Sequence, residues 1–281
     1  GQLGNQMWQI AGTISYALKH DKFTEFPHWK YAKYFNVPFL ENNNIAVDKV
    51  YNEPHFHYSE IPYFEGNVDL RGYMQSPKYF DGINVQELFE LNDEWRKYVD
   101  DLYAKINPKG LKTISFHFRR TDYLNPETSA YHGNLPSTYY AAASVELRKN
   151  DTKKIDYIFL VFSDDIKLIK EETKYKFPEK STYFSEHDDG LSNEDKSIID
   201  LFLQSMCIDN IISNSSFSYW AYLLNRNQNK IQTNNVKVET LNSFVKNLNS
   251  NYLPNSLKVS SNQVMFSLLD YEANNFFIFT I

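Results

Sequence analysis

The residues with the clearest chemical potential lie in one stretch, 113–123, which reads TISFHFRRTDY. Its alternation predicts a β-strand with Ile114, Phe116 and Phe118 on one face and Ser115, His117 and Arg119 on the other. Arg120 and Asp122 follow, so two guanidinium groups, an imidazole and a carboxylate would meet where a buried strand ends. Ligands of open α/β sheets bind at the carboxyl ends of strands, and arginine grips phosphate through two hydrogen bonds. The alternative is an edge strand whose arginines are solvated or paired with surface acids.

The segments after Lys112 alternate between strand and helix patterns. YIFLVF at 157–162 is a buried-strand run, and a shorter strand is expected at 210–213. Helices are expected at 139–148, from 163–165 to about 175, at 197–207 and at 219–224. This alternation predicts a parallel sheet with crossover helices.

The segments before Lys112 are less regular. Residues 1–20 read as a glycine-bearing turn that opens an amphipathic helix, with the strand expected before that turn missing from the sequence. Residues 85–106 carry one helical pattern, and the breaker cluster Asn-Pro-Lys-Gly at 107–110 is the expected domain boundary.

Two further clusters invite both a structural and a functional interpretation. The run Ser215-Ser216-Phe217 opens an apolar helix, where hydroxyl groups can cap free N–H groups or bind an anion. Asp164 and Asp165 follow the 157–162 strand, and we favour capping over metal binding for them because aspartate is a preferred N-cap residue. No other carboxylate cluster nearby would complete a hard-cation site.

The composition excludes several classes of protein. The chain has 281 residues, 42% hydrophobic content and a formal net charge of −6, which is typical of a folded domain and argues against a nucleic-acid-binding surface. A single cysteine excludes an intrachain disulfide, so a reducing, cytoplasmic location is expected. No apolar run is long enough to form an integral membrane segment. The chain begins at Gly1 rather than Met, so the native N-terminus is expected to be absent.

Five motifs, taken together, resemble those of the α-1,2-fucosyltransferases of glycosyltransferase family 11. Their order along residues 1–224 is specific, although each motif alone is weak. They are GQLGNQM at 1–7, GYMQSPKYF at 72–80, HFRRTDY at 117–123 with His132-Gly133 and Tyr139-Tyr140 after it, FSDD at 162–165, and NIISNSSFSYW at 210–220.

The chain departs from the family pattern at four points. The first strand and initiator Met are missing, and Gln2 replaces a usual glycine. Thr121 also replaces a usual glycine, which makes this motif look more like that of the α-1,6-fucosyltransferases. After Lys230 the usual Pro and Trp are absent, and the tail at 236–281 matches no pattern we recognise.

The resemblance implies an α/β, GT-B architecture with two Rossmann-like domains facing a cleft. The expected organisation is an N-terminal acceptor-side domain at 1–110, a GDP-sugar-binding domain at 111–235 and a tail of unknown packing at 236–281. The implied reaction is inverting transfer of L-fucose from GDP-fucose to a glycan hydroxyl, with O2 of a terminal β-galactoside as the expected position, and without a metal or cofactor. The alternatives are an α-1,6- or protein O-fucosyltransferase and a non-catalytic nucleotide-sugar or glycan-binding module. Neither the acceptor nor the oligomeric state follows from the sequence.

The resemblance also suggests roles on the donor side. Departure of the diphosphate develops negative charge, so Arg119 is expected to hold the β-phosphate, with Arg120 or the serine run at 215–216 assisting. Asp122 would orient the arginine pair, while His117, Asp164 and Phe217 would lie at the nucleotide. By resemblance alone, Asp200 would recognise guanine and Asn5 would face the site from the N-terminal domain.

Inversion by direct displacement requires a group that takes the proton from the acceptor hydroxyl. Asp122 is too close to the arginines, because a neighbouring guanidinium lowers the pKa and the basicity of a carboxylate. Glu127 and His132 lie in the loop after the central strand. By resemblance to the α-1,6 enzymes, Glu127 is favoured as the base. The alternatives are that His132 is the base, or that Glu127 is a solvated residue without a catalytic role.

Overall fold

The computed structural model describes residues 2–39, 41, 46–121, 135–148, 156–172 and 176–227. The chain divides into two compact units, Gly1–Tyr98 and Val99–Ile281. The division falls within a helix, on the N-terminal side of the 107–110 turn where the sequence analysis places it. Among the described helices, none has the length and apolar character needed to cross a bilayer.

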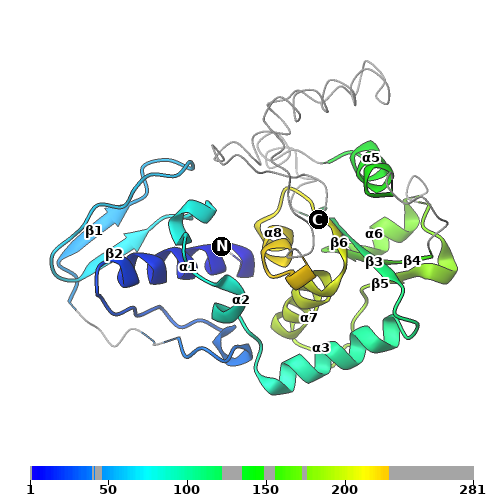
Figure 1. Cartoon of the computed structure of the whole chain (residues 1–281), viewed down its shortest axis with the longest axis horizontal. Helices are drawn as coiled ribbons and strands as arrows, with labels where there is room; N and C mark the ends of the chain where they lie inside the picture. Colours follow the sequence, from blue (N-terminus) through cyan, green and yellow to red (C-terminus); the bar gives the residue numbers. More distant parts are fainter. Residues whose placement is uncertain are drawn as a thin grey trace, which may run out of the picture. The chain divides into compact units, whose positions relative to one another are not determined.

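Unit 1 contains a two-stranded parallel sheet beside a long helix (Figure 1). Strand β1 (Lys49–Asn52) pairs with β2 (Val68–Arg71), and the two strands end side by side, with Asn52 opposite Arg71. The helical elements of this unit are α1 (Leu3–Lys19), η1 (Ala32–Tyr34), η2 (Pro77–Phe80) and α2 (Val85–Leu88).

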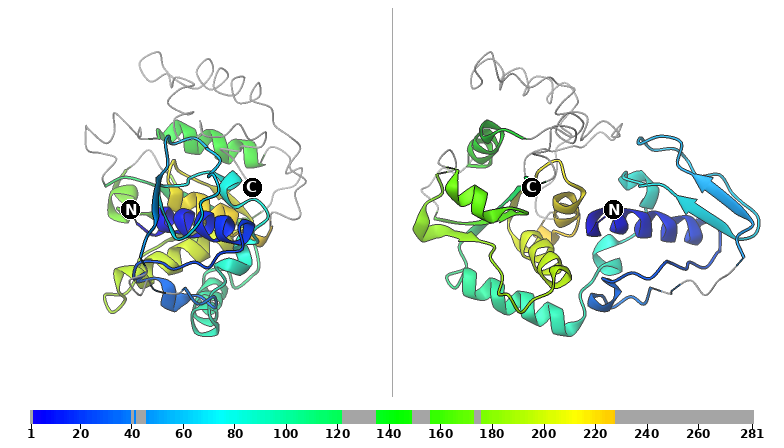
Figure 2. Two further views of the ribbon diagram at one scale, coloured as in Figure 1. Left: turned by 90° about the vertical axis from the view of Figure 1, so that its left-hand side faces the viewer. Right: turned by 180° about the vertical axis from the view of Figure 1, so that it is seen from behind.

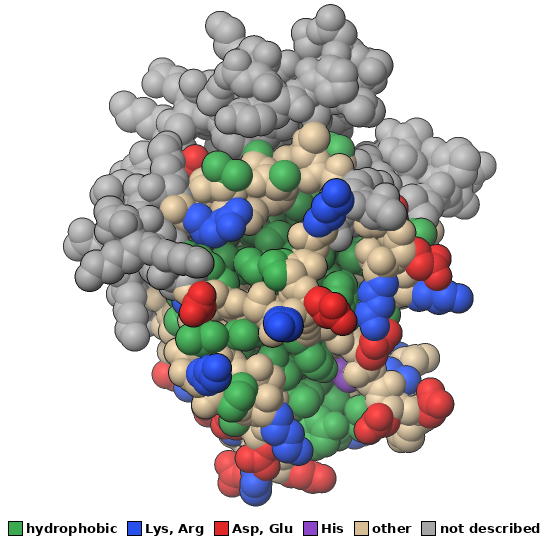
Figure 3. Space-filling model, turned by 90° about the vertical axis from the view of Figure 1, so that its right-hand side faces the viewer, with side chains coloured by type: hydrophobic (Ala, Val, Ile, Leu, Met, Phe, Trp, Pro, Cys, Tyr) green, Lys and Arg blue, Asp and Glu red, His purple; other side chains and the backbone are tan. Residues whose placement is uncertain are grey.

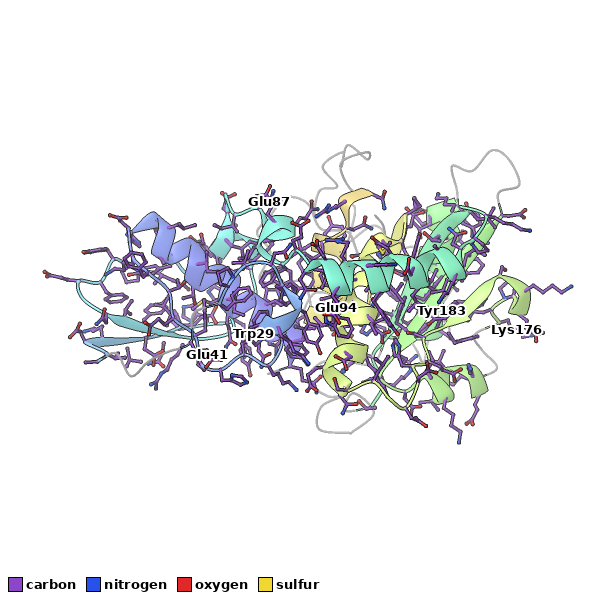
Figure 4. All side chains as sticks on the ribbon, turned by 90° about the horizontal axis from the view of Figure 1, so that it is seen from below. Trp29, Glu41, Glu87, Glu94, Lys176 and Tyr183 are labelled. Carbon is purple, nitrogen blue, oxygen red and sulfur yellow. The ribbon has the colours of Figure 1, made fainter. Side chains whose placement is uncertain are left out.

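The core of unit 1 includes a dense cluster of aromatic side chains. The Trp29 ring, labelled in Figure 4, stacks on Phe35 at a centroid distance of 5.3 Å and meets the edge of Phe39 at 4.7 Å. Phe35 in turn contacts Phe89 at 5.6 Å. Rings of this size bury large apolar areas, which explains how a segment of little regular structure is held in place.

Helix α1 packs directly on the 72–80 motif. The Trp8 and Phe80 rings lie 5.3 Å apart, and Gln9 donates a 2.7 Å hydrogen bond to the Gly72 carbonyl. Gly12 leaves room for Met74, because a Cβ added there would lie 2.9 Å from the Met74 sulfur. The first two motifs of the sequence therefore form one packed body within unit 1.

The prediction of a single helix at 85–106 is wrong. The segment forms α2 and, separately, α3 (Asp93–Ile106). Asn84 accepts hydrogen bonds from the N–H groups of Gln86 and Glu87 and so caps α2. The Asn92 side chain accepts one from the Trp95 N–H, as expected of a residue that starts α3. The apolar periodicity continues through both helices, but Asn84 caps the start of α2 and Asn92 caps the start of α3, so the segment forms two helices.

Unit 2 is built on the expected parallel sheet. Among the described residues, four strands lie in the order β5-β4-β3-β6, and their bounds are β3 (Lys112–Phe118), β4 (Tyr157–Ser163), β5 (Thr182–Phe184) and β6 (Asp209–Ile211). The helical elements that follow α3 are α5 (Ser137–Arg148), α6 (Ile166–Glu171), η4 (Glu179–Ser181), α7 (Asn193–Met206) and α8 (Ser216–Leu223). The expected alternation of strands and helices is confirmed.

The two faces of β3 differ as its alternation predicts. Its apolar side chains Ile114, Phe116 and Phe118 join a core with α5 and α6. Its polar side chains face α7 and α8: Ser115 accepts from Asn210, beside Gln204 of α7, and the His117 ring lies 5.5 Å from the Phe217 ring of α8. Figures 1 and 2 show both pairs of helices around the sheet.

A buried amide network joins the polar face of β3 to the end of α8. Asn210, on β6, donates 2.7 Å hydrogen bonds to the Ser115 hydroxyl and to the Gln204 carbonyl. Asn225, fully buried just after α8, donates to Asn210 Oδ1 at 2.7 Å and to the Cys207 carbonyl at 2.8 Å. The network fixes β6 and α8 on β3.

We expect Asn225→Ala to lower the free energy of unfolding by about 1–3 kcal/mol, because it removes the N–H donors of two buried acceptors. Urea unfolding followed by circular dichroism measures this change. Asn193→Ala, at an exposed position of α7, is the control and should change the free energy little. Equal stability of the two variants would contradict a stabilising role for the network.

Candidate active site

The two arginines at the end of β3 lie in different environments. The Arg119 side chain is 20% exposed and its Nη1 lies 3.1 Å from Asp164 Oδ2. Arg120 is 1% exposed; its Nη1 donates to the Arg119 carbonyl and its guanidinium lies 5.5 Å from the Phe118 ring centroid. Arg119 can therefore reach a ligand from its present position, whereas Arg120 packs into the protein interior.

Asp164 joins the ends of β3 and β4. Its Oδ1 accepts from the Arg120 N–H at 2.7 Å, and its Oδ2 accepts from the Thr121 N–H at 3.2 Å and hydroxyl at 2.5 Å, in addition to the Arg119 ion pair. Phe118 and Ser163 are register partners, so the first residue after each strand lies at the same edge. The carboxylate therefore fixes both the backbone and the side chain at the β3 exit.

The expected capping role of Asp164 is wrong. Asp165 is the N-cap of α6, and its side chain accepts from the Leu168 N–H at 3.0 Å. Among the described residues, the Asp164 carboxylate contacts Arg119. Asp122 lies outside those residues, so its expected role in orienting the arginines stays a prediction. Strand register would have pointed to Asp164, because parallel strands bring their exits together.

His117 is buried and hydrogen-bonded. Its Nδ1 lies 2.8 Å from the Ser213 hydroxyl, and its carbonyl accepts from the Tyr140 hydroxyl at 3.1 Å. Burial lowers the pKa of His117 to about 4; Asp164 opposes this shift and the two arginines add to it. The imidazole is therefore neutral near pH 7 and supplies a hydrogen bond rather than a positive charge.

The serine run caps α8. Ser215 is the N-cap, and its hydroxyl accepts from the Phe217 N–H at 3.3 Å. The Ser218 hydroxyl lies 3.3 Å from the Ser213 and Ser215 carbonyls. Capping by Ser215 is thus confirmed, while anion binding by Ser215 and Ser216 stays a prediction. Ser213, which the sequence analysis did not single out, links this helix start to His117.

Asp200, on α7, belongs to a small polar cluster beside the end of β5. Ser185 follows β5 and donates a 2.5 Å hydrogen bond to Asp200 Oδ1, and His187 Nε2 lies 2.7 Å from the same oxygen. The Asp200 and His187 side chains are 20% and 9% exposed. No sequence pattern singled out Ser185 or His187. Base recognition by Asp200 stays a prediction.

Asn5 is engaged within unit 1. It lies in the first turn of α1, and its Oδ1 accepts a 2.8 Å hydrogen bond from Gln75. Its neighbour Gln6 accepts from the Trp29 indole at 3.0 Å. The remaining predicted site residues, Asp122, Glu127 and His132, lie outside the described residues.

Figure 3 shows a face on which cationic and anionic side chains are interspersed among hydrophobic ones. Among the described residues, no three His, Cys, Asp or Glu side chains gather in a way that could hold a metal ion. Arg119 is a local positive charge in a chain of formal net charge −6.

Comparison with known proteins identifies relatives among glycosyltransferases. Two curated relatives come from Escherichia coli: the O-antigen biosynthesis glycosyltransferase WbnK, 35% identical over 150 residues, and an α-1,2-colitosyltransferase, 31% identical over 171 residues. These matches cover 52% and 57% of this chain and 46% and 53% of the relatives. The chain thus spans about half the length of the curated relatives it matches.

The fold is similar to that of the fucosyltransferase NodZ from Bradyrhizobium. One NodZ crystal structure matches with a TM-score of 0.54 and 15% identity, covering 79% of this chain and 89% of that one. The structure of NodZ α-1,6-fucosyltransferase soaked with GDP-fucose matches with a TM-score of 0.53, 15% identity and the same coverage. The expected α/β, GT-B-type fold is confirmed by this likeness and by the parallel sheets of both units.

The model of glycosyl transferase family 11 matches residues 2–259. This match covers four of the five sequence motifs completely and all of the first motif except Gly1. The chain belongs to glycosyl transferase family 11.

Proposed function

We propose that the protein transfers L-fucose from GDP-fucose to O2 of a terminal β-galactoside, with inversion at the anomeric carbon. The observation that carries this proposal is the partly exposed Arg119 guanidinium, held by Asp164 where β3 ends. Family membership supports glycosyl transfer. The α-1,2-colitosyltransferase relative supports the linkage, and the NodZ crystal soaked with GDP-fucose supports the donor.

In this reaction the bond between the anomeric carbon and a β-phosphate oxygen breaks as the acceptor hydroxyl attacks from the opposite face. Both bonding electrons leave with GDP, and the diphosphate gains negative charge. Arg119 stabilises that charge, and its pairing with Asp164 orients the guanidinium before the substrate binds. The start of α8, with Ser215 and Ser216, adds N–H groups and the positive end of the helix dipole.

The acceptor proton leaves to a general base. We assign this role to Glu127, with His132 as the alternative, because both follow the arginines closely in the sequence. The buried His117 is a poor candidate because burial lowers its pKa to about 4, which makes it a weak base, and because it is hydrogen-bonded to Ser213 and only 5% exposed. We also assign guanine recognition to Asp200, beside Ser185 and His187.

A second donor is favoured by one specific observation, the similarity to an α-1,2-colitosyltransferase. Colitose is a deoxy analogue of fucose, and a pocket that merely tolerates an added hydroxyl discriminates weakly. Parallel assays with GDP-fucose and GDP-colitose on a panel of β-galactosides, followed by linkage analysis, test the donor and the position of transfer. If the enzyme neither hydrolyses nor transfers either donor, the proposed function is wrong. If the product is 1,6-linked or protein-linked, the proposed acceptor is wrong.

Arg119→Lys should lower kcat about 10²-fold or more, the scale for removing one donor that stabilises developing negative charge. Lysine keeps the charge but loses the planar fork. Initial rates with saturating GDP-fucose measure the effect, and Arg148→Lys, at an exposed position of α5, is the matched control. A well-folded Arg119→Lys enzyme that turns over like the wild type would remove Arg119 from the reaction.

Asp164→Asn should lower kcat by about tenfold to a hundredfold, because the amide lacks the negative charge that orients Arg119. The double variant with Arg119→Lys should be far less active than wild type but little worse than Arg119→Lys alone. Both substitutions disrupt the same Arg119–Asp164 ion pair, so their effects should not add. The control is Asp165→Asn, one residue along, where asparagine still caps α6. Equal kcat values for the two asparagine variants would contradict this positioning role.

Chelation should leave activity nearly unchanged, because we propose that fixed cationic side chains, rather than a metal, stabilise the leaving diphosphate. The partly exposed Arg119 guanidinium, held by Asp164, supports this proposal. Rates measured before and after dialysis against EDTA test it. Loss of activity that Mn²⁺ or Mg²⁺ restores would show that a cation takes part.

A further inference from the structure

Unit 1 has its own edge at which two parallel strands end. The segment after β1 begins with Glu53, and the segment after β2 begins with Gly72. Because Asn52 and Arg71 are register partners, these two segments leave the sheet side by side. The start of α1 reaches the same edge through the Gln75–Asn5 hydrogen bond. The carboxyl ends of parallel strands are where α/β folds place ligands.

The Glu53 carboxylate sets the conformation of the segment after β2. Its Oε2 accepts from the Tyr73 N–H at 2.7 Å and from the Met74 N–H at 3.0 Å. Gly72 is required beside it, because a Cβ at that position would collide with the Glu53 side chain. Met74 has a φ of 51°, in the left-handed region that methionine rarely adopts. The turn buries Met74, which is 1% exposed, and directs Tyr73, which is 43% exposed, toward solvent.

The segment after β1 is held at both ends and presents another aromatic ring. Glu53 fixes its start, and the Ser59 N–H donates to the Tyr79 hydroxyl at 3.1 Å near its end. Between them Phe56 is 60% exposed, and its ring stacks on Tyr73 with centroids 6.2 Å apart and an interplanar angle of 23°. Two loops are thus fixed by hydrogen bonds so that they expose a pair of aromatic rings.

We propose that the Phe56–Tyr73 pair is a platform on which a sugar ring of the acceptor glycan stacks. A pyranose has an apolar C–H face that suits an aromatic ring and a rim of hydroxyls that suits polar side chains. The exposed imidazoles of His55 and His57, stacked 4.4 Å apart beside Phe56 in the sequence, and the Tyr73 hydroxyl offer such groups. Fixed, exposed aromatic pairs mark binding surfaces more often than isolated exposed rings do. This inference rests on the proposed glycosyl transfer to a glycan.

Phe23 offers a matched control on the same unit. It is 98% exposed and follows the C-terminal end of α1, whereas the platform lies near the N-terminal end of that helix. The helix has 17 residues, so its two ends are about 25 Å apart. Removing the Phe23 ring takes away equal aromatic area without touching the platform.

The test compares Phe56→Ala and Tyr73→Ala with Tyr73→Phe and Phe23→Ala in the full chain. The acceptor probe is lactose and the donor is GDP-fucose. We expect each platform alanine to raise the acceptor KM about tenfold, the scale of one lost aromatic contact and its buried area. Tyr73→Phe should keep most acceptor binding, and Phe23→Ala should behave as wild type. The KM for GDP-fucose and its hydrolysis without acceptor should not change in any of these variants.

Two outcomes separate the platform from the proposed function. Unchanged acceptor KM values in both alanine variants of an active enzyme overturn the platform alone. If the wild type hydrolyses GDP-fucose without transferring it to lactose, the proposed acceptor fails, and saturation-transfer difference NMR with lactose decides the platform separately. Galactose-ring signals that disappear in Phe56→Ala and Tyr73→Ala but persist in Phe23→Ala support the platform. Signals that are absent from the wild type, or equal in all variants, overturn it.

Discussion

The described structure depends on one kind of interaction, a carboxylate at the end of one parallel strand that binds the backbone leaving the next. In unit 2, Asp164 follows β4 and accepts from the second and third N–H groups after β3. A parallel strand has no hairpin to fix its exit, so an emerging segment would otherwise have several conformations. A hydrogen bond to a charged acceptor contributes about twice as much as a neutral one, which suits it to hold such an exit. Here the same carboxylate also pairs with Arg119, so fold and site depend on a single side chain.

The charge at the site follows from what β3 buries. Its apolar face joins the α5–α6 core, while its polar face meets α7 and α8 through Ser115 and His117. Burial keeps His117 neutral, so the arginines beyond the strand supply the positive charge. Of these, Arg120 is enclosed and Arg119 is partly exposed. A strand that looks dibasic in the sequence therefore presents one accessible cation, with its direction fixed by Asp164.

The sequence predicted the elements that regular periodicity defines, namely β3, β4, α5, the start of α8 and the parallel order of the unit 2 sheet. It failed where a single side chain decides. Asn84 and Asn92 start separate helices within one apolar pattern, and the contacts of Asp164 depend on strand register, which no local pattern encodes. Ser185 and His187 follow β5, a strand of three residues that is too short to show an alternating hydrophobic pattern, so the sequence does not mark them as site residues. Asp122, Glu127 and His132 lie outside the described residues, and their roles stay predictions.

Unit 1 repeats the arrangement of unit 2. Glu53 is the first residue after β1 and accepts from the second and third N–H groups after β2, as Asp164 does between β4 and β3. The difference lies in the first residue after the receiving strand. In unit 2 it is Arg119, which pairs with the carboxylate; in unit 1 it is Gly72, which leaves space for it. The same backbone device thus presents a cation suited to a phosphate in one unit and an aromatic ring suited to a sugar in the other. On this reasoning, the side chains that follow each strand set the ligand chemistry, while the carboxylate sets only where they point.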